Sequence, residues 1–416
     1  MPASSLRIIV TGFIAQHPLL GGVTWDYLQY PLGLARLGHD VYYFEDSGEW
    51  PYKLDGGPCG DDWTAYDSHK NVNHLATVMS RFGFEGKWAY RFPIGEGEWY
   101  GLSDTKRTEI TKSADLLINV SGSLEHPEFY HGADTLAYID SDPVFTQIKI
   151  AQGPEKFRNC VNAHDVFFTF GERLPSFLPA LDYNWRPTRQ PVVLSEWNLC
   201  PPQRDVFTTV MSWTSYEALV YEGQKYGQKD TEFKRFLDLP TKVGCTTMEV
   251  AIGKLLHTWN TDDQDFSQKI KTFTIDNPKW KVPDLLMQAG WSVVDAMAMC
   301  GDIDSYREYV QASKADWSVA KNGYVLGRPG WFSCRSACYL AAGKPVVVQD
   351  TGFSEILPTG AGILSFRTPE EAVAGIREVD SNYSKHAIAA RMIAEQYFNS
   401  DKVLTDLIEN ALNYNQ

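Results

Sequence analysis

Short apolar segments recur along this chain, each followed by a loop that carries glycine, aspartate or serine, with helical patterns between them. The first segments predict a strand over residues 6–10, a helix over 24–37 and a second strand over 41–44. Gly38 ends the helix as a C-terminal cap. Strand, helix and parallel strand form the βαβ unit that opens a doubly wound α/β domain. This order of segments limits the fold more strongly than any other feature.

The same pattern occurs in two halves of the chain. Further strands are predicted at 115–120, 136–139 and 165–170, and then at 205–211, 248–252, 291–294, 317–320, 345–349 and 362–365. The densest proline cluster lies between these two groups. We therefore predict four parts, namely a first domain over 1–185, a linker over 186–204, a second domain over 205–383 and a helical tail over 384–416.

Charge and composition exclude several classes of protein. The 416 residues include 38 Lys and Arg against 52 Asp and Glu, a formal charge of −14, which disfavours nucleic-acid binding. No apolar run approaches the roughly 20 residues needed to span a bilayer, and no signal peptide is recognisable. Of the 7 Cys, only Cys334 and Cys338 lie close together, at a spacing unlike a zinc site. We expect reduced thiols in a cytoplasmic protein.

The most informative segment covers residues 327–355. Its glycines form a turn, Ser333 is a candidate N-cap, and a helix over 334–342 precedes the strand at 345–349. A helix start preceded by glycines is a possible anion site, and Arg335 in its first turn can add a phosphate contact. An ordinary helix–turn–strand unit explains the same residues without a ligand.

A glycine pair, Gly21-Gly22, lies in the first strand-to-helix loop. Small residues there let a phosphate or sugar approach the backbone, although a turn alone also explains them. The loop lacks the GxGxxG fingerprint of dinucleotide-binding proteins, and no GxxxxGK[ST] phosphate loop is present.

These motifs together resemble a known family. The glycine pair, the run LGLARLGHDVYYFE and the later AAGKPVVVQDTGFSEIL look like nucleotide-sugar glycosyltransferases of the GT-B fold. Residues 313–352 are also similar to bacterial sequences described only as glycosyltransferase-like. The resemblance implies two Rossmann-like domains facing each other across a cleft, with the donor on the C-terminal domain and the acceptor largely on the N-terminal one. It also implies a last helix that crosses back to the first domain.

The resemblance implies a set of donor-binding residues by position. They are Gly21, Gly22, Trp213, Thr214, Lys321, Gly330, Trp331, Phe332, Ser333, Arg335, Asp350, Thr351, Gly352 and Glu355. One departure concerns the two Glu, eight residues apart, of many retaining members, because Gly330 and Cys338 occupy those positions here. The His-Gly-Gly start of the plant-type donor motif is also missing.

Three residues are candidate catalytic groups. An inverting transferase needs a base for the acceptor hydroxyl, and His17 lies in the loop where inverting members place it. Asp140 and Asp142 either orient that histidine or act as the base themselves. Asp142 is equally explained as the turn residue that precedes a proline. A retaining enzyme would need no protein base near the acceptor.

Two segments resemble metal sites. Residues 125–131 hold two His and two Glu, but a proline interrupts them and HExxH is absent. Asp140-Ser141-Asp142 matches the DxD pattern that holds manganese in GT-A enzymes. Transferases of the GT-B family usually need no metal, because a helix dipole and basic groups neutralise the leaving diphosphate. We therefore predict no metal and no cofactor.

The leading hypothesis is transfer of a sugar from a nucleoside diphosphate sugar to an acceptor hydroxyl. A nucleotide-sugar epimerase of the same fold is an alternative from another reaction class. A non-catalytic nucleotide-binding or scaffold protein is a third, since two-domain α/β architectures support many functions. The sequence leaves the sugar, the nucleobase, the acceptor, the stereochemical outcome and the oligomeric state open.

Overall fold

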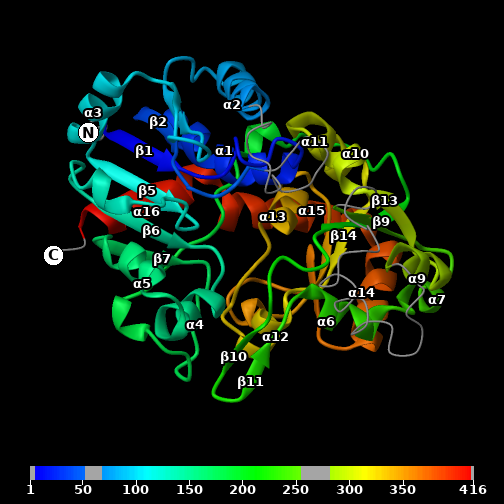
Figure 1. The fold of residues 1–416 in the computed structure, drawn as a ribbon. Helices are drawn as coiled ribbons and strands as arrows, with labels where there is room; N and C mark the ends of the chain where they lie inside the picture. The colour runs from blue at the N-terminus through cyan, green and yellow to red at the C-terminus, as the bar shows by residue number, and fades with distance from the viewer. Residues whose placement is uncertain (1–4, 52–67, 254–281, 414–416) are drawn as a thin grey trace. The chain divides into compact units, whose positions relative to one another are not determined.

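The computed structural model describes residues 5–51, 68–253 and 282–413. Contacts divide the chain into two units, of which unit 1 comprises Met1–Val193 and Tyr397–Gln416, and unit 2 comprises Leu194–Gln396. Each unit is built on one large, mainly parallel sheet with helices packed on it (Figure 1). The predicted class, two doubly wound α/β units, is confirmed.

Unit 1 contains an 8-stranded sheet in the order β4-β3-β2-β1-β5-β6-β7-β8. All neighbours are parallel except β3 and β4. Its strands are β1 Arg7–Thr11, β2 Asp40–Glu45, β3 Trp88–Arg91, β4 Trp99–Gly101, β5 Leu116–Val120, β6 Leu136–Asp140, β7 Val166–Thr169 and β8 Arg186–Pro187. Its α-helices are α1 Gly21–Arg36, α2 His69–Arg81, α3 Asp104–Lys112, α4 Phe145–Gln152, α5 Glu155–Asn162 and α16 Ser400–Leu412.

Unit 2 contains a 6-stranded parallel sheet in the order β13-β12-β9-β14-β15-β16, and a separate hairpin, β10-β11. Its strands are β9 Val206–Met211, β10 Leu219–Tyr221, β11 Gln224–Tyr226, β12 Thr247–Ile252, β13 Ser292–Asp295, β14 Ala315–Ser318, β15 Val346–Gln349 and β16 Ile363–Phe366. Its α-helices are α6 Lys229–Phe233, α7 Leu239–Lys242, α9 Val282–Gln288, α10 Ala296–Cys300, α11 Ile303–Ala312, α12 Asn322–Gly327, α13 Cys334–Ala341, α14 Pro369–Ser381 and α15 Tyr383–Ile393.

The strand order reverses once in each unit. In unit 1 the chain builds the sheet outward from β1 on one side and then from β5 on the other. In unit 2 the reversal falls between β9 and β14. In open parallel sheets ligands bind outside the carboxyl ends of the strands at such a switch point. The fold therefore singles out two places, the loops after β1 and β5 and the loops after β9 and β14.

The C-terminal segment returns to unit 1 and closes it. Val192 N–H donates to the Phe398 carbonyl at 2.7 Å, and Ser400 N–H to the Val192 carbonyl at 2.9 Å. α16 then packs on α1, where a Cβ at Gly33 would lie 2.5 Å from Leu404 Cδ1. A larger residue at this position would require the Leu404 side chain to move. Unit 1 resumes at Tyr397 rather than at position 384, because α15 groups with unit 2.

Two details of the fold differ from the sequence reading. α1 begins at Gly21, three residues before the predicted start, and continues through Pro31. β8 pairs with β7 and extends the sheet of unit 1 into the segment read as a linker. Contacts place the division between the units after Val193.

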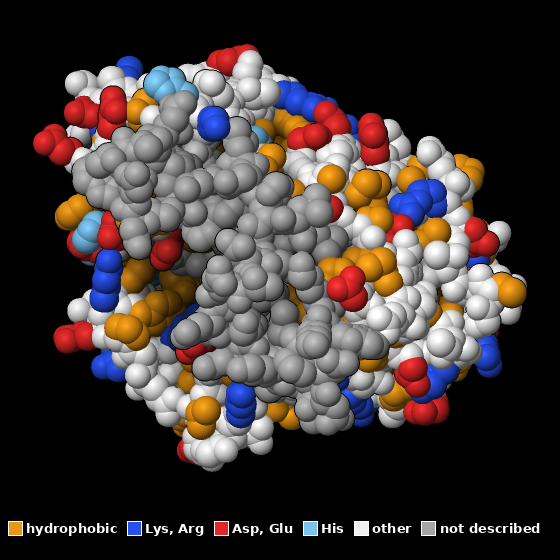
Figure 2. Space-filling view, turned by 45° about the vertical axis from the view of Figure 1, so that its right-hand side comes forward, with side chains coloured by type: hydrophobic (Ala, Val, Ile, Leu, Met, Phe, Trp, Pro, Cys, Tyr) orange, Lys and Arg blue, Asp and Glu red, His pale blue; other side chains and the backbone are white. Residues whose placement is uncertain are grey.

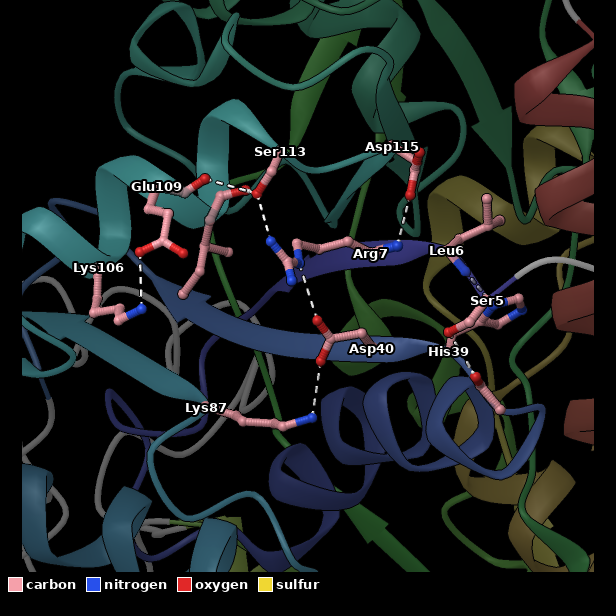
Figure 3. A network of polar contacts seen from close by, with 12 residues as sticks. Ser5, Leu6, Arg7, His39, Asp40, Lys87, Lys106, Glu109, Ser113 and Asp115 are labelled. Carbon is pink, nitrogen blue, oxygen red and sulfur yellow. Dashed lines mark hydrogen bonds and ion pairs between the residues drawn. The ribbon is translucent and has the colours of Figure 1, made fainter.

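The amino-terminal edge of the unit 1 sheet is fixed by a polar network (Figure 3). Asp40 joins Arg7 Nε and Lys87 Nζ, each at 2.9 Å, and so links the starts of neighbouring strands. Arg7 N–H donates to Asp115 Oδ2 at 2.6 Å. Burial acts to raise the pKa of Asp40, but the bonds from Lys87 and Arg7 hold it below its usual value. The network fixes the register of the strands at the edge opposite the switch point.

Charged side chains of both signs are interspersed over the face that Figure 2 shows. Among the helices in the described ranges, none is long and apolar enough to cross a bilayer.

Candidate functional site

The switch point of unit 2 lies beside the start of α13. The loop before this helix is tied to the loop after β15, since Gly330 N–H donates to the Thr351 carbonyl at 2.9 Å and Thr351 Oγ1 donates to the Trp331 carbonyl. Gly352 has φ +97°, and a Cβ there would lie 2.8 Å from the Arg328 carbonyl. Glycine is therefore required where these two predicted loops meet.

The first turn of α13 is open to a ligand. Ser333 occupies the N-cap position, but its side chain makes no capping hydrogen bond. The first amides of a helix have no partner within the helix, and its dipole gives this end a partial positive charge. An acceptor from outside the helix, such as a phosphate oxygen, suits this position.

A small cavity opens at the same place. Four of the predicted donor-binding residues line it, namely Trp331, Phe332, Ser333 and Arg335. The ends of β14 and β15 supply Ser318, Val348 and Gln349, and α6 supplies Lys229. The cavity thus brings together the loop before α13 and the strand ends at the switch point of unit 2.

The cavity presents hydrogen-bond donors that lack acceptors. Across the described residues, the half-buried Lys229 makes no hydrogen bond or ion pair. The indole N–H of Trp331 and Nε of Arg335 are buried and also have no hydrogen-bond partner there. Buried donors normally find acceptors, so their presence together indicates a site for an acceptor-rich group.

Lys229 is the unexpected member of this site. Burial and, to a lesser extent, the positive charges of Arg335 and Lys321 lower its pKa to about 7, while Asp316 acts to raise it. An ammonium in this environment gains strongly from a nearby anion. The sequence offered little signal for it, because Lys229 follows a short hairpin, β10-β11, that the pattern did not predict.

Arg335 is more deeply engaged than the sequence indicated. Its side chain is 10% exposed, its Nη1 donates to the Val210 carbonyl at 2.7 Å, and its Nε lies 3.4 Å from Asp316 Oδ1. It therefore bridges β9 and β14 at the switch point of unit 2. This geometry leaves less of the guanidinium for a bidentate phosphate contact than the sequence reading assumed.

Lys321 lies among aromatic rings at the start of α12. Its Nζ bonds the Tyr216 hydroxyl at 3.1 Å and lies 4.6 Å from the centre of that ring and 5.4 Å from that of Tyr324. Tyr324 in turn stacks on Trp331 at 4.4 Å. Cation–π contacts of this kind hold the ammonium beside the cavity wall.

The other residues of unit 2 that were predicted to bind the donor nucleotide mainly bond side chains and amides of the same unit. Asp350 accepts from Arg328 at 3.2 Å, from Arg367 at 2.6 Å and from the Gly352 amide at 3.0 Å. Burial acts to raise its pKa, but these bonds hold it below its usual value. Glu355 pairs with Arg328 at 3.0 Å. Neither carboxylate lines the cavity; both shape the loop after β15.

The two predicted donor-binding residues that follow β9 lie outside the cavity. Trp213 packs against the core of unit 2, with its ring 5.3 Å from that of Phe233. Thr214, the next residue, is half-buried. The first strand of the second unit therefore contributes to the site through the Val210 carbonyl that Arg335 bonds.

The switch point of unit 1 carries His17 and the glycine pair. α1 begins at Gly21, and its N-cap residue, Leu20, provides no side-chain cap. His17 is half-buried in the preceding loop, and its ring lies edge-to-face with Phe13 at 6.3 Å. His17 thus lies in the loop after β1, on one side of the point where the strand order reverses.

Asp140 and Asp142 differ in their surroundings. Asp140 is 1% exposed, and it accepts from Gln147 at 2.9 Å, from Thr169 at 2.8 Å and from the Asp142 amide at 2.9 Å. Burial raises its pKa. Its carboxylate shapes the turn after β6, whereas Asp142 is only half-buried at the surface of that turn. Of the two, Asp142 is the better placed to meet a substrate.

The two metal-like segments are committed to other contacts. Glu125 pairs with Arg91 at 2.7 Å and Lys156 at 3.0 Å, and His126 lies 3.0 Å from Glu128. In the DxD segment, both oxygens of Asp140 already accept protein hydrogen bonds. The described ranges contain no group of three or more metal-ligating side chains.

Comparison with known proteins identifies the fold. No protein-family model matches the sequence, and no curated protein is detectably similar to it. Solved structures do match, and over nearly the whole chain the fold is that of the GT-B glycosyltransferases.

Two examples have TM-scores of 0.51 and 0.50. Sucrose-phosphate synthase from Thermosynechococcus elongatus has a TM-score of 0.51 and 10% identity, and the match covers 97% of this chain and 98% of that one. HepE from Anabaena, solved in complex with UDP, has a TM-score of 0.50 and 11% identity, with 97% and 98% covered. At such identities the likeness concerns the fold.

Proposed function

We propose that this protein is a glycosyltransferase that moves a sugar from a nucleoside diphosphate sugar to an acceptor hydroxyl without a metal ion. One observation carries the proposal: among the described residues, Lys229 and the buried indole N–H of Trp331 are donors without an acceptor, and both residues line one cavity at the switch point of unit 2. A diphosphate is rich in acceptors and negatively charged, so it satisfies these donors and the start of α13 together.

The same groups suit the chemistry of transfer. The acceptor oxygen forms a bond to the anomeric carbon, and the bond from that carbon to the diphosphate oxygen breaks. The electron pair leaves with the nucleoside diphosphate, whose growing charge is stabilised by Lys229, Lys321 and the α13 dipole. In an inverting reaction the acceptor proton passes to the His17 imidazole, a common general base.

The remaining predicted residues divide between binding and support. Ser333 and Trp331 are proposed to contact the donor, because they line the cavity. Asp350, Thr351 and Gly352 are proposed to hold the loops that form it. Gly21 and Gly22 are proposed to let a sugar approach the start of α1. The glycosyltransferase fold of the solved neighbours supports this division without fixing the sugar or the acceptor.

A thermal-shift panel tests the donor site. Uridine, guanosine, adenosine and thymidine diphosphates are compared, beginning with UDP because it is bound in the HepE structure. A nucleotide at about 100 times its dissociation constant should add about 2.7 kcal/mol to the free energy of unfolding. We expect one nucleotide to do so, and Lys229→Met to abolish the shift.

Lys225→Met is the matched control, because Lys225 is exposed on β11 and does not line the cavity. It should keep the shift. No shift with any nucleotide, for a folded protein, would contradict a donor site in this cavity.

Transfer is then followed with the corresponding radiolabelled nucleotide sugar. His17→Ala should keep the thermal shift and lose transfer. Turnover of the donor in the absence of any acceptor would instead indicate an epimerase, and binding without turnover a non-catalytic protein.

A further inference from the structure

The loop that carries His17 is held by side chains at the end of β2. Three consecutive amides of this loop donate to them: Ile14 N–H to the Tyr43 hydroxyl at 3.1 Å, Ala15 N–H to Glu45 Oε2 at 2.8 Å, and Gln16 N–H to Glu45 Oε1 at 2.7 Å. The contacts end one residue before His17. Two of these three amides therefore depend on a single carboxylate.

Glu45 is an unusual group to find in this position. It is fully buried, and among the described residues the Tyr43 hydroxyl also donates to its Oε2, at 2.9 Å. Among the described residues no cation pairs with it. A buried carboxylate without a counter-ion is costly, and here burial raises its pKa to about 7, although the amides and Tyr43 act to lower it.

Among the described residues, two neighbouring helices place a tyrosine and an asparagine beside this cluster. From α1, Tyr27 reaches the space beside Gly12, next to the Tyr43 hydroxyl. From α2, Asn71 Nδ2 donates to the Ala15 carbonyl at 2.6 Å. In the loop itself, His17 is the titratable side chain that follows.

Asp46, the next residue after Glu45, is engaged elsewhere. It accepts from Arg91 and, at 2.8 Å, from the Tyr130 hydroxyl. Tyr130, like Tyr43, is an uncharged partner because burial raises its pKa well above its usual value. The protonation state of Glu45 itself is therefore the main variable of this cluster.

We propose that Glu45 is the positioning residue of the His17 loop and that it fixes this loop only when it is ionised. A carboxylate accepts both the Ala15 and the Gln16 amide. A protonated carboxyl carries an O–H on one oxygen and has no negative charge, so it is a weaker acceptor for these two amides. A weakly bonded buried amide favours opening of the loop.

The role of the loop in transfer rests on the proposed function. The hold of ionised Glu45 on the His17 loop, which we call the latch, does not. If His17 accepts the acceptor proton, kcat should fall as the pH falls through about 7, because Glu45 becomes protonated. The apparent affinity for the donor nucleotide, which depends on Lys229 in unit 2, should instead rise as the pH falls, because the protonated lysine attracts the diphosphate.

Amide hydrogen exchange of the peptide containing residues 12–20 tests the latch without any substrate. Protection, corrected for the intrinsic pH dependence of exchange, should be at least tenfold higher at pH 8 than at pH 6 in the wild type. Glu45→Gln cannot ionise and carries an amide donor, so its protection should be low and equal at both pH values. Tyr43→Phe, which removes only the Ile14 acceptor and one bond to Glu45, should keep the pH dependence.

Equal protection of the wild-type loop at pH 6 and pH 8 would overturn the proposal. So would wild-type protection at pH 8 in Glu45→Gln. Should Glu45→Gln fail to fold, the wild-type series and Tyr43→Phe still decide the question. A protein that binds no nucleotide but shows the pH-dependent loop would contradict the proposed function and leave the latch standing.

Discussion

The switch points of the two units share a topology and differ in chemistry. Beside the switch point of unit 2, Lys229 and the Trp331 indole N–H have no acceptor among the described residues. In unit 1 the buried carboxylates Glu45 and Asp140, at the ends of β2 and β6, accept hydrogen bonds from the loop after β1, from α4 and from β7. The contrast supports the proposal that unit 2 receives an anion, whereas unit 1 uses its buried negative groups to hold neighbouring segments.

The largest expected effect is a loss of stability, and it tests whether Arg335 is needed to hold the folded structure of unit 2. Arg335→Met leaves the buried Asp316 without its ion pair and should lower the free energy of unfolding by about 3–5 kcal/mol. Denaturant unfolding measures this. Arg335→Met combined with Asp316→Asn should recover part of the loss, because no buried charge is then left. A single mutant as stable as the wild type would make Arg335 a ligand-binding residue instead.

The next prediction separates the two aspartates of unit 1. Asp140→Ala removes the acceptor of Gln147 and Thr169 inside the core and should cost about 2–3 kcal/mol of unfolding free energy. Asp142→Ala, at the half-buried surface of the same turn, should stay within about 0.5 kcal/mol. The two variants serve as controls for each other in one unfolding series. Equal losses of unfolding free energy would contradict the distinction between Asp140, which supports the fold, and Asp142, which we propose faces a substrate.

A smaller effect concerns the ligand-free stability of unit 2. The pKa of Lys229 is lowered to about 7 on folding, so above that pH the unfolded chain holds a proton that the folded protein has lost. Stability should therefore rise with pH from about 7 to 9, by less than about 1 kcal/mol per unit because the side chain is half-exposed and solvent screens it. Lys229→Met should remove this slope and leave the protein at least as stable at pH 7. A less stable variant would mean that Lys229 supports the fold.

Much of the fold could be predicted from the sequence. Strands such as β1, β5 and β15 are short apolar runs between polar loops, and the pattern found them within one or two residues. The short edge strands β4 and β8 and the hairpin β10-β11 were missed, because two or three residues carry too little periodicity. The return of the chain to unit 1 depends on packing of α16 on α1 at Gly33, which no local pattern encodes.

The candidate site was predictable only in part. A glycine loop that precedes a helix, such as Gly330 to Ser333, can be recognised in the sequence because its backbone geometry requires particular residues. Lys229 and Glu45 cannot be recognised in this way, since their importance comes from the residues that surround them. Lys229 has no anionic partner among the described residues, and the carboxylate of Glu45 accepts from two loop amides. Their roles as ligand contact and loop latch remain predictions.

Calorimetric titration of the nucleotide sugar selected in the thermal-shift panel tests the anion site of unit 2 most directly. Run at pH 7.5 in buffers of different ionisation enthalpy, it counts the protons taken up on binding. The charge of the two esterified phosphates is constant near this pH, so uptake reports on the protein. We expect a substantial fraction of one proton to be taken up by the wild type and by Lys225→Met, and none by Lys229→Met, which should bind at least tenfold more weakly. Binding without proton uptake, and with the same affinity in Lys229→Met, would contradict an anion site built around Lys229.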